Sequence, residues 1–95
     1  MFYINVWLTV KQAQDVARVR DALARAAQSS RGEEGCERFE VYHSESDPLR
    51  FLLTEHWRSK PDWEAHRGRK AFKEIYEPQV LPLVTRDAHF CSLIA

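Results

Sequence analysis

Hydrophobic and polar residues alternate along several stretches of the chain, and each of these stretches predicts a β-strand. In the first stretch, Ile4, Val6 and Leu8 are separated by single polar or aromatic residues. A period of two places such side chains on one face of a strand. Aromatic residues occupy both faces of this first strand, so we expect neither face to be fully exposed. The four predicted strands cover residues 2–10, 36–44, 50–57 and 85–94.

Between the strands, the apolar spacing changes to the three- and four-residue pattern of amphipathic helices. The first helix is predicted over residues 13–30, where Val16, Val19 and Leu23 fall on one side. Glycines at positions 32 and 35 follow it, as is typical of a helix end.

A second helix is predicted to begin after Ser59, because Asp62 lies three residues further on and Pro61 stands between them. This arrangement is typical of a helix N-terminus. We expect this helix to end near Gly68. A third helical piece is predicted from residue 70 to about residue 77, and we expect two prolines to interrupt or end it, at positions 78 and 82.

The predicted order of elements is β-α-β-β-α-β, the split βαβ arrangement. The expected fold is therefore α+β and ferredoxin-like, with a four-stranded antiparallel sheet, and residues 1–95 form a single domain. Right-handed connections place both helical layers on one face of the sheet. The opposite face is too apolar to remain in water, so we predict a homodimer. Strands two and four lie at opposite edges, so Cys36 and Cys91 are not expected to pair.

The composition of the chain argues against several classes of function. Hydrophobic residues make up 44% and charged residues 29% of the chain, and the net charge is +0. No basic patch for nucleic acid or membrane is predicted, and no apolar run is long enough to cross a bilayer. We expect a cytoplasmic protein. No nucleotide-binding loop occurs, and the four histidines lack metal-type spacing, so no metal or cofactor is expected.

With these elements placed, a series of residues through most of the chain resembles the antibiotic biosynthesis monooxygenase family, part of the dimeric α+β barrel superfamily. The series lies mainly in the predicted hairpin and the short helix after it. Its members are Glu34 to Cys36, Arg38 to Tyr42, Asp47 and Pro48, Arg50 and Phe51, Glu55, Trp57, Ser59, Glu64 to His66, and Phe72.

The resemblance implies a dimeric barrel with a pocket in each subunit between the sheet and the helices. Well-known members oxidise quinols or anthrones with molecular oxygen, without metal, flavin or haem. Similar proteins degrade haem or isomerise a phosphorylated signal molecule. This chain differs from many relatives in having Ala71 before Phe72. The asparagine, tryptophan and histidine of the haem-degrading relatives align with Val6, His66 and Tyr76, which disfavours haem degradation.

The candidate site residues lie on or near the short helices. His66 is three residues after Trp63, so both can share a helix face, and a histidine beside aromatic rings is suited to act as a general base. Trp63 and Trp57 offer flat apolar surfaces to a planar substrate. Tyr76 can donate a hydrogen bond to a substrate oxygen. Phe72 and Val6 complete the expected substrate-binding set.

Each candidate also has a structural alternative. His66 could be a hydrogen-bonded residue at the boundary between helix and sheet, and the tryptophans could be core residues. Asn5 and Trp7 are expected at the interface between sheets. The strand charges Arg38, Glu40 and Glu55 are expected to pair across that interface.

The leading hypothesis is a cofactor-independent monooxygenase that oxidises a small aromatic substrate, such as a hydroquinone, phenol or anthrone, with molecular oxygen. Two alternatives remain open. One is an isomerase of a small phosphorylated signal metabolite, which the basic run from Arg67 to Lys70 supports slightly. The other is a binding module without catalytic activity.

Overall fold

The protein is described by a computed structural model that covers all 95 residues. Its strands are β1 (Phe2–Val10), β2 (Cys36–His43), β3 (Arg50–Trp57) and β4 (Val84–Cys91). Its α-helices are α1 (Val16–Arg31), α2 (Lys60–His66) and α3 (Glu77–Gln79). Two 3-10 turns, η1 (Ala13–Asp15) and η3 (Leu81–Leu83), and one π-helical segment, η2 (Ala71–Tyr76), complete the order of elements.

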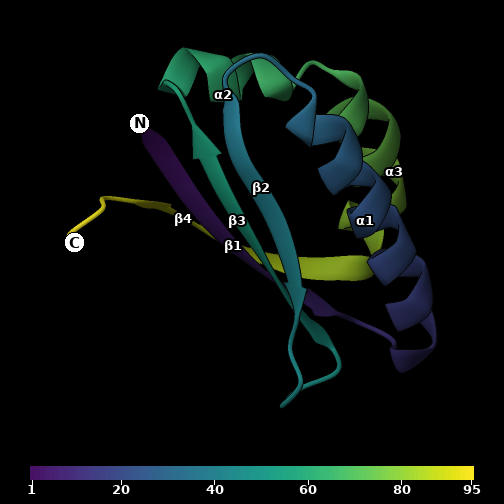
Figure 1. The fold of residues 1–95 in the computed structure, drawn as a ribbon. Coiled ribbons are helices and arrows are strands. Elements are labelled where there is room, and N and C mark those ends of the chain that lie inside the picture. The colour runs from purple at the N-terminus through teal and green to yellow at the C-terminus, as the bar shows by residue number, and fades with distance from the viewer.

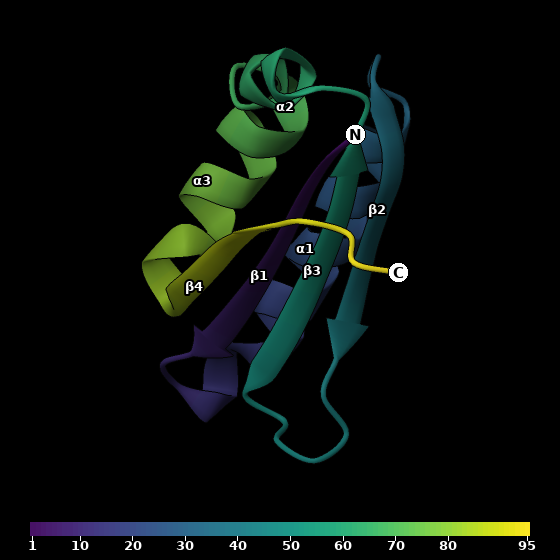
Figure 2. The same ribbon diagram turned by 90° about the vertical axis from the view of Figure 1, so that its left-hand side faces the viewer.

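The strands form one antiparallel sheet in the order β2-β3-β1-β4. The helices lie on one face of this sheet and leave the other face uncovered (Figure 1). Figure 2 looks onto the uncovered face, with α1 behind the strands. The predicted α+β, split βαβ fold is therefore confirmed. Cys36 and Cys91 are both free thiols on strands at opposite edges.

The core lies between the sheet and the helices, as the alternation in β1 predicts. Ile4, Val6 and Leu8 are each at most 1% exposed. From the other side, α1 buries Val19 and Leu23 to the same degree. Complete burial of a side chain of this size contributes roughly 1.5–3 kcal/mol, so the contact between α1 and the sheet holds the two layers together.

The last strand is shorter than expected. The alternation predicted a strand over residues 85–94, but β4 ends at Cys91. The reason is its partner: β4 pairs only with β1, and the pairing of Tyr3 with Cys91 is the last in the register. Beyond that point β1 is almost finished, so the last residues of the chain have no strand to pair with.

The prediction that two prolines interrupt or end the third helical piece was wrong for Pro78, through which helical structure continues, but the helix does end before Pro82, at Gln79. The η2 segment is π-helical, and the backbone N–H of Glu77 bonds to the carbonyl of Phe72, five residues earlier. An α-helical turn then restarts at Glu77, so Pro78 lies in the first turn of α3. Proline is tolerated there because the first turn does not use its missing N–H.

The uncovered face of the sheet carries half-buried side chains that are tied to one another. Asn5 accepts a hydrogen bond from Thr54 Oγ1 at 3.1 Å. The Arg50 guanidinium lies 4.4 Å from the centre of the Trp7 ring. The predicted placement of Asn5 and Trp7 on this face is confirmed.

The start of β2 lies against the start of α2. Ser59 caps α2 by accepting the backbone N–H of Asp62 at 3.3 Å, as the sequence predicts. The Asp62 carboxylate also binds Arg58 at 3.0 Å. Gly35 fits beside this carboxylate because it has no side chain, and it adopts φ +83°, a left-handed conformation that favours glycine.

Substitution of this glycine provides a test of the junction. A Cβ at position 35 would lie 2.4 Å from Asp62 Cγ and would also strain the backbone. We expect Gly35→Ala to lower the free energy of unfolding by about 1–3 kcal/mol, measured by urea denaturation. Gly32→Ala is the matched control, because Gly32 has φ −85° and its nearest neighbour would be 3.7 Å away. Equal stability of the two variants would contradict this account.

Candidate functional site

A cavity of about 400 Å³ lies between the helix-facing side of the sheet and the helices. This volume is in the usual range of small-molecule sites, roughly 300–1,000 Å³. Most of the lining is hydrophobic and comes from α1, η2, the end of α2 and all strands but β1. The polar lining residues other than tyrosine are Ser30, Glu55, His66, Arg67, Glu77 and Arg86.

His66 lies at the end of α2 and is only 5% exposed. Its Nδ1 is 2.9 Å from Oε1 of Glu33, a residue of the connection between α1 and β2. A carboxylate oxygen can only accept, so we assign the ring proton to Nδ1. Burial lowers the pKa of His66 below its ordinary value of 6.5, although Glu33 opposes this shift. The ring is therefore neutral near pH 7, with the lone pair on Nε2.

The other ring nitrogen of His66 is free to act on a ligand. No protein group bonds to Nε2, and this atom is not completely buried, so a ligand can reach it. The imidazole is surrounded by aromatic rings, with centroids at 4.7 Å for Trp57, 5.8 Å for Phe39 and 6.0 Å for Phe72. An acceptor in such a dry, rigid position is suited to removing a proton from a bound substrate.

Glu55 is a second titratable group in the cavity. It is 5% exposed, and its Oε1 accepts a hydrogen bond from Trp57 Nε1 at 3.0 Å. Its other oxygen has no protein partner and is not completely buried, so a ligand can reach it as well. Burial raises the pKa of the Glu55 carboxyl to about 7, while the bond from Trp57 and the charge of Arg86 oppose the shift. Glu55 can therefore hold or release a proton near neutral pH.

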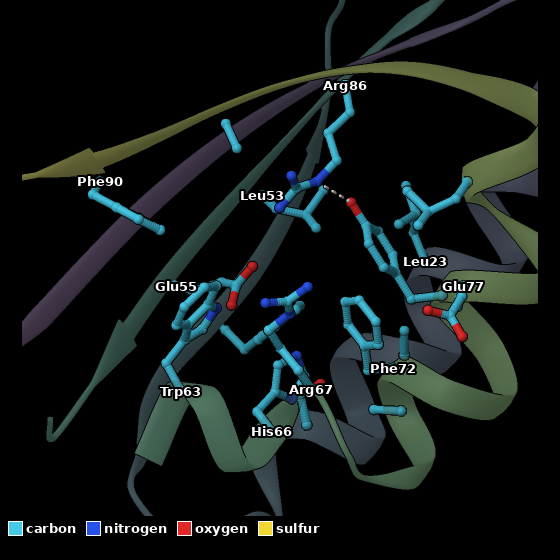
Figure 3. A pocket seen from close by; sticks show the side chains of 17 residues that line it. Leu23, Leu53, Glu55, Trp63, His66, Arg67, Phe72, Glu77, Arg86 and Phe90 are labelled. Atoms are coloured by element: carbon cyan, nitrogen blue, oxygen red, sulfur yellow. Dashed lines mark hydrogen bonds between the residues drawn. The ribbon is translucent and has the colours of Figure 1, made fainter. Parts of the chain in front are cut away.

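Tyr76 and Arg86 form a hydrogen-bonded pair on the opposite side of the cavity. Arg86 Nε donates to the Tyr76 hydroxyl at 3.1 Å (Figure 3). The hydroxyl keeps its own proton, which it can donate to a ligand oxygen. Burial raises the pKa of Tyr76, and the charge of Arg86 opposes the shift. Tyr76 is thus a neutral hydrogen-bond donor at neutral pH.

Aromatic rings form one end of the cavity. The Trp63 ring lies 5.2 Å from the Phe90 ring, edge to face, and both line the cavity. The Arg67 guanidinium lies over Trp63 at 5.4 Å and over Phe72 at 5.7 Å. In Figure 3, Trp63 and Phe72 stand on either side of Arg67. Flat apolar surfaces of this kind suit a planar ligand.

The structure brings four of the six expected site residues to the cavity and leaves two away from it. His66, Tyr76, Trp63 and Phe72 line it. Trp57 and Val6 are buried in the core and do not line it. Trp57 instead supports the site from behind, since its indole bonds to Glu55 and contacts the His66 ring.

Sequence reasoning missed three residues of the site: Glu33, Glu55 and Arg86. Glu55 was expected to pair across the sheet interface, but it points toward the helices. The signal was present, because the period of two places Glu55 on the same face as Phe51 and Leu53. For Glu33 no comparable signal exists, since it lies in an irregular connection far from His66 in sequence.

No group of three or more histidine, cysteine, aspartate or glutamate side chains is arranged to hold a metal ion. None of the helices has the length and apolar character that a membrane span requires.

Comparison with known proteins agrees with this architecture. A family model described as antibiotic biosynthesis monooxygenase matches residues 1–78. No curated protein matches the chain significantly. Among solved structures, a protein of Nitrosomonas europaea assigned to the antibiotic biosynthesis monooxygenases has a TM-score of 0.90 at 23% identity, with 100% of each chain covered.

Two further structures are also similar. One from Deinococcus radiodurans, with the same assignment, has a TM-score of 0.77 at 23% identity and covers 98% of this chain and 95% of its own. A conserved protein of unknown function from Bacteroides thetaiotaomicron has a TM-score of 0.85 at 20% identity. The match covers 97% of this chain and 96% of that protein. At these identities the likeness establishes the fold alone.

The fold and the cavity define a small split βαβ protein with a largely apolar pocket under its helices. The chain belongs to the antibiotic biosynthesis monooxygenase family, since the family model covers most of its length. The resemblance noted in the sequence is therefore confirmed.

The unusual pKa of Glu55 predicts a pH-dependent stability. The folded pKa of about 7 is above the ordinary value of 4.5, so the stability that protonated Glu55 contributes is complete below pH 4.5 and is lost as the pH rises through 7. Glu55→Gln can still accept the Trp57 N–H and cannot ionise. Relative to the wild type, we expect this variant to gain about 2 kcal/mol in unfolding free energy between pH 5 and pH 8.

Urea denaturation at several pH values measures this difference. Glu45→Gln is the control, because Glu45 is exposed in the connection between β2 and β3. A Glu55→Gln variant with the same pH profile as the wild type would rule out a protonated, buried carboxyl.

Proposed function

We propose that the protein is a cofactor-independent monooxygenase that oxidises a small aromatic substrate, of the hydroquinone, phenol or anthrone type, with molecular oxygen. The observation that carries this proposal is the neutral His66, bonded to Glu33 through Nδ1 and with Nε2 free in an apolar cavity. Membership of the antibiotic biosynthesis monooxygenase family supports the proposal.

In the proposed reaction the substrate itself supplies the electrons. Nε2 of His66 accepts the acidic proton of the substrate and leaves a carbanion or phenolate, which is more easily oxidised than the neutral molecule. One electron passes to oxygen, and the two radicals combine to form a C–O bond. Protonation gives a hydroperoxide. For a CH₂ group, loss of the second C–H proton and cleavage of the O–O bond then yield the carbonyl and water, so that one oxygen atom enters each product.

The remaining polar groups have roles in this scheme. Tyr76, held by Arg86, donates its O–H to the substrate oxygen on which negative charge develops. Glu55 supplies and receives protons in the later steps, for which its pKa of about 7 is suited. The hydrophobic lining excludes water and positions the ring against the aromatic side chains of the cavity.

One alternative is supported by the same acid–base groups. His66 and Glu55 could move a proton between two carbons or oxygens without any oxidant, as in isomerisation of a phosphorylated signal metabolite. Turnover under nitrogen would distinguish the isomerase from the monooxygenase. Ligand binding without either reaction would indicate a binding module.

We further propose that the functional form is a homodimer in which the uncovered sheet faces pack together. This face carries the half-buried Tyr3, Trp7 and Leu52 and the half-exposed Tyr42. Burial of these side chains between two sheets removes apolar surface from water, and a domain of this size has a thin core of its own.

Light scattering after size exclusion tests the dimer. We expect a mass twice that of the 11.2 kDa chain at micromolar concentration. Leu52→Arg, which places a charge at the centre of the proposed interface, should shift the mass to that of the monomer. Ala24→Arg adds the same charge on the exposed side of α1 and should leave the dimer intact. A monomeric wild type would disprove the proposal.

The monooxygenase proposal predicts a specific effect of His66→Asn. The Asn amide can still donate to Glu33 in place of Nδ1–H but offers no base. We expect oxygen consumption with a confirmed hydroquinone or anthrone substrate to fall about 10²–10⁴-fold, measured with an oxygen electrode. In the wild type, activity should decline on the acid side with an apparent pKa below 6.5, where His66 becomes protonated.

The control is His43→Gln, because His43 bonds to the Pro48 carbonyl through Nε2 and a glutamine amide preserves that donor. It should retain full activity. Unchanged turnover and an unchanged pH profile in His66→Asn would remove His66 from the mechanism.

A further inference from the structure

Two arginine side chains line the cavity without a carboxylate partner. The Arg67 side chain makes no ion pair and no hydrogen bond, and its guanidinium lies over the rings of Trp63 and Phe72. Arg86 has one partner, the neutral Tyr76 hydroxyl at 3.1 Å. By contrast, Arg58, outside the cavity, binds both Glu34 and Asp62. Neither guanidinium in the cavity therefore forms an ion pair within the protein.

The acidic residues around the cavity do not balance these charges. Glu77 pairs with Lys73 at 3.5 Å. Glu33 is engaged by His66 at 2.9 Å and by Arg69 at 3.8 Å. Glu55 accepts the Trp57 indole N–H, and burial raises its pKa to about 7, so that a substantial fraction of it is uncharged at neutral pH.

The positions of the two arginines suit a single anionic group. Arg67 follows the end of α2 and Arg86 projects from β4, on the other side of the cavity. In Figure 3 their side chains extend toward each other across the space above Phe72. A guanidinium binds a carboxylate or phosphate through paired N–H donors. Both arginines are exposed residues, so a ligand anion can reach them directly from solvent.

We propose that the substrate is a planar aromatic anion, whose carboxylate or phosphate binds between Arg67 and Arg86 while its rings pack against Trp63 and Phe72. A cavity of about 400 Å³ accommodates a ring system of this kind. The inference deepens the proposed function, because it names the substrate class of the same cavity.

Calorimetry under nitrogen tests the inference independently of oxygen chemistry. The probes are 2-naphthoate and its neutral analogue of the same shape, 2-naphthamide, with 2-naphthyl phosphate as a third ligand. We expect the wild type to bind 2-naphthoate at least about tenfold more tightly than 2-naphthamide, the size expected of hydrogen bonds to a charged group. Tighter binding of 2-naphthyl phosphate than of 2-naphthoate would support the site and identify its anion as a phosphate.

Variants identify the residues responsible. Arg67→Met and Arg86→Met each replace the charged guanidinium with an apolar side chain of similar length. Each variant should show a smaller preference for the anion. The double variant should abolish the preference and still bind 2-naphthamide, which also demonstrates that the cavity is intact. Arg18→Met is the control for net charge, because Arg18 is a largely exposed residue of α1 outside the cavity. It should behave as the wild type.

Two results would overturn the inference: equal affinity of the wild type for 2-naphthoate and 2-naphthamide, including no binding of either, or an anion preference that survives in the double variant. Oxygen consumption is measured separately. A protein that prefers the anions but never consumes oxygen with a hydroxylated aromatic acid retains the anion site and loses the proposed monooxygenase reaction. The reverse result retains the reaction and rejects the anion site.

Discussion

The hydrogen bond between Nδ1 of His66 and Oε1 of Glu33 is the contact on which the site depends. It joins the end of α2 to the connection between α1 and β2, so it links the two helical parts that cover the sheet. It also determines which nitrogen of the imidazole carries the proton. The side chains of both partners are less than a tenth exposed, so water competes little for this contact. One interaction therefore fixes the position of the imidazole, its tautomer and one end of the cavity.

The polar groups of the cavity are separated according to their chemistry. The neutral His66 ring can accept a proton, and Glu55 can hold or release one near neutral pH. Both are supported by the buried Trp57, which donates to Glu55 and contacts the imidazole. Arg86 and Tyr76 form a second, hydrogen-bonded pair, and the charge of Arg86 also acts on Glu55. Hydrophobic side chains line the cavity between these groups. The cavity thus combines groups that can accept a proton with groups that can donate hydrogen bonds.

The fold could be predicted from the sequence because its periodicities are strong. The alternation in β1 and the helical spacing of Val19 and Leu23 each correspond to a buried face. The site was predictable only in part. Glu55 was taken for an interface charge because of its chemistry, although its position in β3 placed it among buried residues. Trp57 was expected to line the cavity but is packed on all sides in the core. An apolar pattern in the sequence does not distinguish these two positions. The pairing of Glu33 with His66 depends on the path of an irregular connection, which no local pattern encodes.

The three tryptophans occupy three different surroundings. Trp7 lies on the uncovered sheet face under Arg50, Trp57 is fully buried, and Trp63 borders the cavity. Indole emission depends on local polarity and on nearby quenching groups, so the intrinsic fluorescence of this protein combines three separable signals. Only Trp63 borders the cavity, so a change in emission on addition of a ligand would report occupancy of the cavity through this residue. The molecule thus contains its own optical probe for identifying ligands before any reaction is known.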